Sequence, residues 1–197
     1  MFSGIIKNIG TIVRVTEKQG GREYEIRTSL RRSLNMGESV LIAGICSTVI
    51  KKTPTTITVF HMPETLAKTT STEWRKGTLV NIEPSLRVGE DISGHVVSGH
   101  VDGNARVSEI REEGVCKWVS FSLSKDLAKY MIPKGSVAVD GVSLTVTDAR
   151  KQSFSVALIP YTLSHTTLGI IKKDDPVNIE VDQVAKYIER FASRGKK

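Results

Sequence analysis

The sequence lacks a run of about 20 mostly apolar residues of the kind that spans a bilayer. Its longest stretch without a formal charge, residues 152–171, is interrupted by Pro160, His165 and Gly169. Residues 1–7 do not place a basic segment before a long apolar one, so no secretory signal peptide is recognised. We therefore expect a cytoplasmic protein that does not associate with a membrane.

Cysteine and aromatic residues are scarce. The two cysteines, Cys46 and Cys116, have the spacing of neither a metal site nor a redox motif, and free thiols in a reducing compartment are the simplest interpretation. Aromatic residues make up 6% of the chain, and none interleaves with the basic clusters at residues 31–32, 51–52, 172–173 and 194–197. Because single-stranded nucleic acids are usually bound by stacking on aromatic rings, we interpret the net charge of +7 as a solvated surface and expect no nucleic-acid partner.

Motifs that cradle phosphates or present a nucleophile are absent as well. The chain has no phosphate-binding glycine loop ending in Lys-Ser or Lys-Thr, no dinucleotide fingerprint and no Gly-x-Ser-x-Gly elbow. His95 and His100 are five residues apart, which places them on opposite faces of an extended strand, and no Cys/His cluster completes a metal site. The sequence therefore predicts no metal site and no nucleotide cofactor.

An internal repeat is present at an offset of 97 residues. Residues 39–49 align with 136–146, residues 65–70 with 162–167, and residues 80–83 with 177–180, and 13 of these 21 positions are identical. Average residue usage would give roughly one or two identities by chance. The repeat predicts two tandem domains, at residues 1–86 and 98–182, joined by a linker at 87–97 and followed by a C-terminal segment at 183–197.

Each repeat has the pattern of a small antiparallel β-barrel. Asp140-Gly141 lies between the β-rich runs 137–139 and 142–146 and is a strong hairpin signal. Further strands are expected at residues 5–15, 24–28, 56–60, 118–122, 154–158 and 177–181, with short helical turns at 63–66, 124–131 and 160–163. We predict an all-β chain of two six-stranded antiparallel Greek-key barrels plus a C-terminal amphipathic α-helix.

The C-terminal helix has no counterpart after the first repeat. Asp182 is its expected N-cap and Gly195 its expected end, and Val184, Tyr187, Ile188 and Phe191 fall on one face. This face packs either against its own barrel or against another subunit.

Polar residues recur on one face of the strand after each hairpin. Ser143 and Thr145 alternate with Val142, Leu144 and Val146, and Cys46 and Thr48 take their places in the first repeat. An ordinary solvent-facing strand is one interpretation, and a hydroxyl-lined binding strip is the other. The glycine-rich segment at residues 94–103 is poor strand filler and suggests a close backbone approach to a ligand.

Taken together, these motifs resemble the riboflavin synthase family. The resemblance covers nearly the whole chain and rests on residues 1–6, 94–103, 134–146, 158–163, 166–169 and 177–182. It implies a transferase that dismutates two molecules of 6,7-dimethyl-8-ribityllumazine, one of which donates a four-carbon unit to the other. The implied products are riboflavin and 5-amino-6-ribitylaminopyrimidinedione, and no cofactor is implied.

The resemblance also implies a homotrimer assembled by the C-terminal helices, and it suggests lumazine synthase as a partner. Each barrel would bind one lumazine, and the reacting pair would meet between the N-terminal barrel of one subunit and the C-terminal barrel of a neighbour. Non-catalytic lumazine-binding relatives, which serve as an antenna or a store, are the alternative. Those relatives lose the Gly-His-x-x-Ser-Gly-His segment that this chain keeps at residues 94–100.

Site residues are carried over by motif. The catalytically sensitive positions implied are Ser39, Cys46, His100, Asp140, Ser143, Thr145 and Asp182. The N-terminal site would use Gly4, Ile5, Ile6, Cys46, Ser47, Thr48, Phe60, His61, Met62, Pro63, Glu64 and Thr65. The C-terminal site would use Gly99, His100, Val101, Lys134, Ser143, Leu144, Thr145, Ile159, Pro160, Tyr161, Thr162, Leu163 and Ser164.

Three residues of the first barrel depart from the family pattern. Ala43 stands where Asn or Asp is usual, and Ser47 and Ser71 each replace a leucine. Because Ser47 would point inward, its hydroxyl is expected to lack a partner, and we predict that Ser47→Leu combined with Ala43→Asp raises the melting temperature. In the second barrel, Tyr161 occupies a place where acidic residues or histidine are common.

Overall fold

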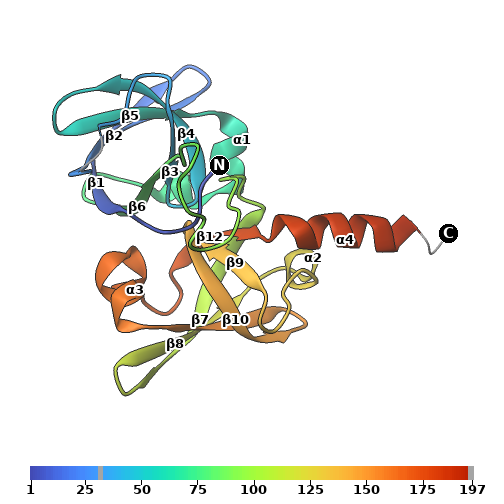
Figure 1. Cartoon of the computed structure of the whole chain (residues 1–197). Helices are drawn as coiled ribbons and strands as arrows, with labels where there is room; N and C mark the ends of the chain where they lie inside the picture. Colours follow the sequence, from blue (N-terminus) through green and yellow to red (C-terminus); the bar gives the residue numbers. More distant parts are fainter. Residues whose placement is uncertain (31–32, 195–197) are drawn as a thin grey trace.

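The computed structural model describes residues 1–30 and 33–194, and it consists of two closed six-stranded antiparallel barrels (Figure 1). The basic residues at 31–32 and the predicted helix end at Gly195 lie outside the described part. The first barrel contains β1 (Asn8–Lys18), β2 (Gly21–Arg27), β3 (Ser39–Ile42), β4 (Ile45–Lys52), β5 (Thr56–His61) and β6 (Leu79–Pro84). The second contains β7 (Gly103–Glu113), β8 (Cys116–Ser122), β9 (Ser136–Val139), β10 (Val142–Arg150), β11 (Ser153–Leu158) and β12 (Pro176–Val181).

The two barrels have the same topology, which confirms the predicted fold. The strand order is β1-β2-β5-β4-β3-β6 in the first barrel and β7-β8-β11-β10-β9-β12 in the second. Even the β-bulges recur, since the register shifts between Val49 and Lys51 in β4 and between Val146 and Asp148 in β10. Bulges bend a strand and help a small sheet to close.

The hairpin predicted at Asp140-Gly141 is present, with φ of 45° and 79° at its two residues. Ala43 and Gly44 adopt the same conformation in the first barrel, with φ of 45° and 81°. Two positive φ angles in succession are the signature of the type I′ turn, which matches the twist of the strands it joins. The first barrel therefore keeps the turn although alanine is a poorer residue for it than aspartate.

Short helices connect the strands, as the proline positions indicate. Those in the first barrel are α1 (Pro63–Lys68) and the 3₁₀ turn η1 (Thr70–Glu73), and those in the second are α2 (Lys125–Ala128), α3 (Pro160–His165) and the 3₁₀ turn η2 (Thr167–Gly169). Pro63 and Pro160 each start a helix, and the Ser124 side chain caps α2 by accepting from the Leu127 N–H. The predicted helices at 63–66, 124–131 and 160–163 are confirmed, with shifted ends.

One strand prediction is wrong at its start, and one long strand was missed. The first strand begins at Asn8 instead of residue 5, because residues 3–6 leave the first barrel and run along the second. The long strand β7 was not predicted at all, since only Ala105 and Val107 of it are buried and its second half is rich in charged residues. β7 is nevertheless the counterpart of β1, and it closes the second barrel between β8 and β12 as β1 closes the first between β2 and β6.

The barrels touch through a pair of reciprocal asparagine contacts. Asn81 Nδ2 donates to the Asp140 carbonyl at 3.0 Å, and Asn178 Nδ2 donates to the Ala43 carbonyl at 2.8 Å. Both asparagines are 1% exposed. Each barrel thus uses the middle of its last strand to hold the hairpin turn of the other, which fixes how the two units are oriented.

The core of the first barrel contains a polar cluster that the second barrel lacks. Ser47 is 4% exposed and His61 is 2% exposed, and their Oγ and Nε2 atoms are 2.9 Å apart. The Tyr24 hydroxyl donates to the Ser71 carbonyl at 2.7 Å. At an offset of 97 the second barrel has Phe121, Leu144, Leu158 and Leu168 in the corresponding places.

This cluster contradicts the expectation that the Ser47 hydroxyl lacks a partner. The serine does point inward as expected, but its hydroxyl has a partner in His61. Leucine at residue 47 would crowd the imidazole and leave Nε2 without that partner, so we expect Ser47→Leu with Ala43→Asp to lower the melting temperature. Ser47 and His61 occupy the places that Leu144 and Leu158 have in the second barrel. Changing Ser47 alone removes the hydrogen bond between the two side chains.

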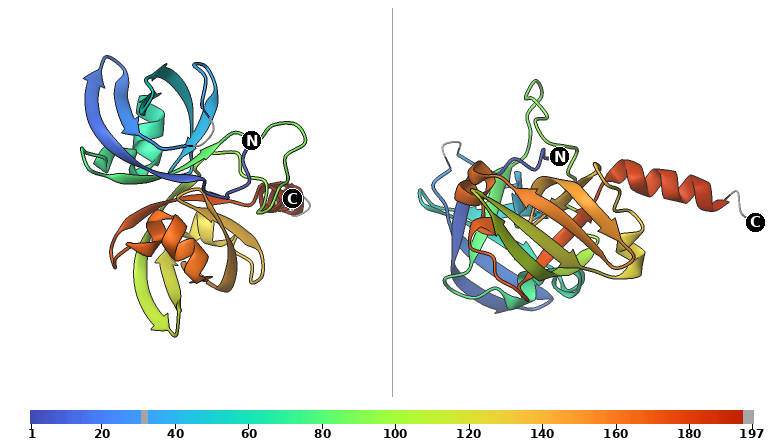
Figure 2. Two further views of the ribbon diagram at one scale, coloured as in Figure 1. Left: turned by 60° about the vertical axis from the view of Figure 1, so that its left-hand side comes forward. Right: turned by 90° about the horizontal axis from the view of Figure 1, so that it is seen from below.

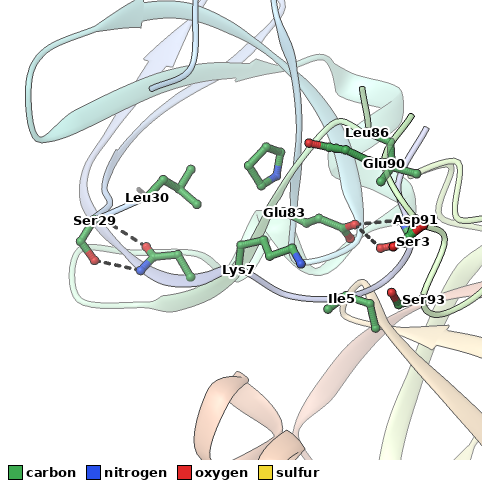
Figure 3. Close-up of a pocket in the computed structure, with 12 residues that line it drawn as sticks. Ser3, Ile5, Lys7, Ser29, Leu30, Glu83, Leu86, Glu90, Asp91 and Ser93 are labelled. Atoms are coloured by element: carbon green, nitrogen blue, oxygen red, sulfur yellow. Dashed lines mark hydrogen bonds between the residues drawn. The ribbon is translucent and has the colours of Figure 1, made fainter. Parts of the chain in front are cut away.

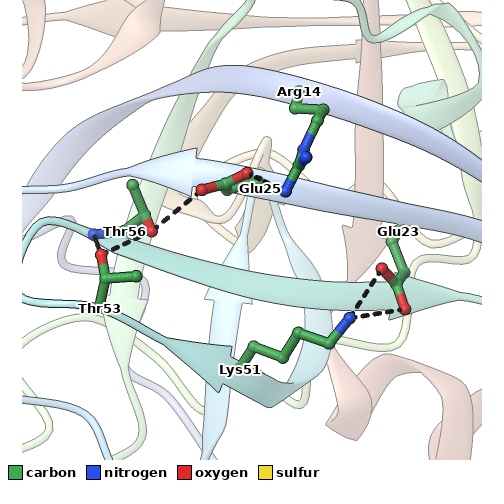
Figure 4. Close-up of polar contacts among 6 residues, drawn as sticks. All are labelled: Arg14, Glu23, Glu25, Lys51, Thr53 and Thr56. Carbon is green, nitrogen blue, oxygen red and sulfur yellow. Dashed lines mark hydrogen bonds and ion pairs between the residues drawn. The ribbon is translucent and has the colours of Figure 1, made fainter.

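Two ion pairs between strands lie on the surface of the first barrel (Figure 4). Arg14 pairs with Glu25 at 2.9 Å and Lys51 with Glu23 at 3.2 Å. Exposed pairs of this kind contribute about 0–1 kcal/mol each. The basic residues that these pairs use are part of an ordinary solvated surface.

The C-terminal helix α4 (Gln183–Arg194) projects away from both barrels (Figures 1 and 2). Its predicted N-cap is confirmed, since Asp182 Oδ1 accepts from the Val184 N–H at 2.9 Å. Val184, Tyr187, Ile188 and Phe191 are 58–67% exposed, so this face does not pack on its own barrel. Within the described residues, no helix is both long enough and apolar enough to cross a membrane.

Candidate functional site

The segment before each barrel lies against the other barrel. Phe2 and Val97 form a β-bridge with bonds of 2.8 and 3.0 Å between their backbone groups. From this bridge, residues 3–6 run along the second barrel, where the Gly4 carbonyl accepts from the Ser143 N–H at 2.9 Å. Residues 98–101 run along the first barrel, where the Gly99 carbonyl accepts from the Cys46 N–H at 2.8 Å.

Glycine is required where each segment meets a strand. Gly4 and Gly99 have φ of 74° and 81°, which side-chain-bearing residues rarely adopt. A Cβ atom on Gly4 would lie 2.6 Å from the Ser143 Cβ, and one on Gly99 would lie 2.5 Å from the Cys46 Cβ. The two glycines therefore allow residues 3–6 to lie directly against β10 and residues 98–101 to lie directly against β4.

This placement corrects how the candidate residues are divided between the sites. Gly4, Ile5 and Ile6 belong with the C-terminal barrel, and Ile6 is buried in that barrel's core. Gly99, His100 and Val101 belong with the N-terminal barrel, and Val101 packs against that core. A strand pattern alone cannot show this placement, because both segments are bound through the backbone.

The C-terminal strip is formed by β10, the end of β11 and α3. Ser143 is half-buried and Thr145 is exposed, on the face opposite to the buried Leu144. The β10–β11 register, which pairs Val146 with Val156, brings Ile159 level with Ser143. The remaining candidates of this strip follow Ile159 along the start of α3: Pro160, Tyr161, Thr162, Leu163 and Ser164.

Lys134 lies beside this strip in a strained backbone conformation. Its N–H donates to the Val146 carbonyl at 2.8 Å and its φ is 69°. The residue at the same place in the first barrel is Gly37, with φ of 81°. A lysine therefore occupies a conformation that glycine would adopt without strain.

The N-terminal strip repeats this arrangement with other side chains. Cys46 is half-buried and Thr48 is exposed on β4, and Ser39 is the cross-strand partner of Thr48. Phe60 is half-buried at the end of β5, next to the start of α1 with Met62, Pro63, Glu64 and Thr65. The side chains of Ser47 and His61, like that of Leu144 in the other barrel, point into the core, so these three cannot contribute side-chain contacts to a surface ligand.

His95 was missed as a site residue. Its Nδ1 lies 2.7 Å from the Ser143 Oγ, and its Nε2 is buried without a hydrogen-bond partner. Burial lowers the pKa of His95, although the nearby Asp182 and Glu180 carboxylates raise it. A neutral imidazole bonded to a strip hydroxyl can accept a proton. The signal was present in the sequence, because His95 opens the same glycine-rich segment that contributes His100.

Asp140 and Asp182 lie off the two strips. Asp140 Oδ1 accepts from the Asn178 N–H at 2.8 Å at the contact between the barrels, and burial raises the pKa of Asp140 to about 7. Asp182 caps α4 and lies near His95. Their placement fits the support of the barrel interface and of His95 more closely than direct contact with a ligand.

The first turns of α1 and α3 carry different pairs at equivalent positions. Glu64 and Lys68 form an ion pair at 2.9 Å in the first barrel. Tyr161 and His165 replace them in the second, with their rings stacked at a centroid distance of 4.0 Å. The two strips thus share a backbone design and differ in charge. Nowhere in residues 1–30 and 33–194 do three or more His, Cys, Asp or Glu side chains form a group that could hold a metal ion.

Comparisons with known proteins agree with the two-barrel site. The chain matches the lumazine binding domain family twice, at residues 3–85 and 98–182. It is 37% identical to riboflavin synthase of Actinobacillus pleuropneumoniae over 195 residues, 97% of this chain and 89% of the relative. It is 38% identical to riboflavin synthase of Brucella abortus (strain 2308) over 198 residues, 98% of each. The crystal structure of LumP complexed with riboflavin matches with a TM-score of 0.84 and 25% identity, over 92% of this chain and 99% of that chain. The chain therefore belongs to the riboflavin synthase family and carries two copies of its lumazine-binding domain.

Proposed function

We propose that the chain catalyses the dismutation of two molecules of 6,7-dimethyl-8-ribityllumazine. One molecule transfers a four-carbon unit to the other, which gives riboflavin and 5-amino-6-ribitylaminopyrimidinedione. The observation that carries the proposal is the duplicated strip, because a reaction between two copies of one substrate needs two similar sites. Near full-length similarity to relatives named riboflavin synthase supports it.

Each strip holds one lumazine in this proposal. The uracil-like ring and the ribityl chain of the lumazine offer hydrogen-bond donors and acceptors that match backbone groups and hydroxyls. Thr48 in the first barrel and Thr145 in the second provide exposed hydroxyls beside a glycine segment. The protein's main task is then to hold two flat rings in register, which lowers the entropy cost of a reaction between two molecules.

The C-terminal strip is suited to removing a proton from the lumazine. The methyl group at ring position 7 is acidic, and its loss of a proton leaves an anion delocalised over the ring. His95 accepts the proton, directly or through Ser143, and the Lys134 ammonium stabilises the negative charge. The anion then attacks the second lumazine, and the four-carbon transfer follows.

A homotrimer completes the site in this proposal. The exposed face of α4 supplies the contact, since four large apolar side chains on one helix face are unusual at a solvent-exposed surface. Assembly brings the N-terminal strip of one subunit to the C-terminal strip of its neighbour. The free cysteines fit the reducing cytoplasm, and lumazine synthase is a candidate partner because its product is the substrate.

Mixing the purified protein with the lumazine tests the function. The protein, treated with a chelator, should form riboflavin, which is followed by its absorbance and by chromatography of both products. Tight lumazine binding without riboflavin formation would show an antenna or storage protein instead. Activity that returns only with an added metal would contradict the metal-free mechanism.

A further inference from the structure

We propose that Glu83 and Glu180 are positioning residues, each of which holds the segment that completes the binding strip of the opposite barrel. Both belong to the repeated Val-Asn-Ile-Glu motif at residues 80–83 and 177–180, whose conserved spacing in the two halves the catalytic proposal does not explain. The inference rests on the proposed function for the meaning of the strips, but the contacts themselves do not depend on it.

Glu83, on the last strand of the first barrel, binds the segment that crosses to the second. Its Oε1 accepts from both the N–H and the hydroxyl of Ser3 at 2.8 Å (Figure 3). Its Oε2 accepts from the Gly4 N–H at 3.0 Å. Glu83 is 1% exposed. Gly4 in turn accepts from the Ser143 N–H, so a chain of two hydrogen bonds connects Glu83 to the C-terminal strip.

Glu180, on the last strand of the second barrel, repeats these contacts in the other direction. Its Oε1 accepts from the N–H and the hydroxyl of Ser98 at 2.7 Å, and its Oε2 accepts from the Gly99 N–H at 2.8 Å. Gly99 accepts from the Cys46 N–H, which lies in the N-terminal strip. Six hydrogen bonds to two buried carboxylates thus recur with the same partners, a Ser-Gly pair in each case.

A carboxylate is the group that these contacts require. Each one faces three donors and offers two oxygens without a proton, whereas an amide offers one oxygen and turns an NH₂ group toward an N–H donor. Burial raises the pKa of Glu83, and the bonds from Ser3 and Gly4 act against that rise. Such an expensive buried acid is hard to explain as core filling, since the equivalent volume could hold leucine.

The crossed arrangement gives the two residues a distinctive signature. If Glu83 acts through Gly4, its loss disturbs Ser143 in the second barrel although Glu83 belongs to the first. If Glu180 acts through Gly99, its loss disturbs Cys46 in the first barrel. A residue that only stabilises its own barrel would disturb the strip of that same barrel when it is lost.

The test uses Glu83→Gln and Glu180→Gln in the full-length protein, with Glu112→Gln as a control for loss of a surface carboxylate. Backbone amide exchange is measured by mass spectrometry for peptides that contain Cys46 or Ser143. Alkylation of Cys46 by iodoacetamide gives a second readout, with Cys116 as the internal reference. Steady-state kcat and KM for the lumazine are measured in parallel.

We expect Glu180→Gln to speed alkylation of Cys46 and amide exchange at Cys46 by about tenfold or more, the loss expected for a hydrogen bond to a charged group. Glu83→Gln should speed exchange at Ser143 by a similar factor and leave the alkylation rate of Cys46 unchanged. Both should lower kcat/KM, and Glu112→Gln should change none of these values. Effects confined to each glutamate's own barrel, or equal effects on both strips, would overturn the inference.

Variants on the donor side keep the test decisive if a glutamine variant does not fold. Ser3→Ala and Ser98→Ala each remove one of the three bonds and leave the carboxylate in place. They should give smaller changes with the same crossed pattern, and no change at either strip would refute the inference. Amide exchange and alkylation do not require turnover, so they test the contacts of Glu83 and Glu180 even in a protein without riboflavin synthase activity. An active protein that lacks the crossed pattern would refute the inference about the two glutamates and leave the proposed function standing.

Discussion

The buried Ser47–His61 pair makes the first barrel sensitive to acid. His61 is 2% exposed, its Nδ1 lacks a hydrogen-bond partner, and its ring lies 5.0 Å from Tyr24 and 5.5 Å from Trp74 between centroids. Burial lowers the pKa of His61 to about 4 from the ordinary value of 6.5. The folded chain thus keeps the imidazole neutral at pH values where the unfolded chain protonates it.

The sign and size of the effect follow from this difference. The unfolded state binds the extra proton. The stability that the buried neutral imidazole retains is therefore fully present above pH 6.5 and is lost as the pH drops from about 6.5 to about 4. A shift of one pKa unit corresponds to about 1.4 kcal/mol, so the full loss approaches about 3 kcal/mol, of which about 2 kcal/mol is lost by pH 5. A loss of this size is a large fraction of the stability of an ordinary domain.

The double variant Ser47→Leu/His61→Leu tests the reasoning, because it installs the leucine pair that the second barrel has at residues 144 and 158. Urea unfolding at pH 8 and pH 5 should show that the variant loses about 2 kcal/mol less stability than the unmodified protein over this range. His165→Leu, which removes an exposed imidazole instead of a buried one, is the control variant.

The single variant Ser47→Leu separates the pair and should lower the free energy of unfolding at pH 8 by roughly 1–3 kcal/mol. Adding His61→Leu should restore much of that loss. If the double variant keeps the full pH dependence of the unmodified protein, His61 does not titrate as its burial implies and the reasoning fails.

Three further predictions concern the site, the assembly and the barrel contact. His95→Gln should slow exchange of the 7-methyl protons of bound lumazine with D₂O by about 10²-fold or more, followed by proton NMR, and undiminished exchange would contradict its role as the base. Deleting residues 183–197 should yield species smaller than a trimer in sedimentation velocity and lower riboflavin formation, and a deletion that stays trimeric would refute the role of α4. Because the pKa of Asp140 is raised to about 7, stability is lost as the pH rises from about 4 through 7. Asp140→Asn should therefore raise the free energy of unfolding by a few kcal/mol at pH 8 and by little at pH 4, and an equal effect at both would contradict it.

Much of the fold could be predicted because its signals are local. A short stretch of sequence is enough to recognise the Asp140-Gly141 turn and the helix starts at Pro63 and Pro160. The repeat at an offset of 97 residues then extends what is recognised in one half to the other half. The sequence does not show β7 in the same way, since a strand with one partly solvated face and many charges has little hydrophobic alternation.

The partition of the site could not be predicted because it depends on contacts between distant backbone groups. The bonds from Ser143 to Gly4 and from Cys46 to Gly99 connect residues 139 and 53 positions apart, and glycine has no side chain whose pattern would reveal its partner. The buried cluster around His61 was missed for a related reason. Ser47 and Ser71 look like separate departures in sequence and His61 like a site residue, and only the fold shows that all three are buried in the first barrel.

The two strips differ at the points where identical substrates need different treatment. One lumazine must lose a proton while the other accepts the resulting nucleophile, and this difference must come from the protein. The second barrel has His95 bonded to Ser143 and a strained lysine at residue 134, whereas the first has Cys46 and Gly37. The first strip has charged and basic groups of a different kind, His100 next to Gly99 and the Glu64–Lys68 ion pair on α1.

Lys134→Gly tests this asymmetry, because it gives the second barrel the residue that the first has at position 37. Glycine is the natural residue at a φ of 69°, so the change relieves backbone strain of about 1 kcal/mol and should leave the melting temperature equal or slightly higher. It also removes the cation that we propose stabilises the lumazine anion, so kcat should fall by about tenfold or more. A protein that loses activity while gaining stability would show that the lysine is kept for the reaction. If turnover survives unchanged, the negative charge is stabilised elsewhere, and the C-terminal strip is not distinguished by Lys134.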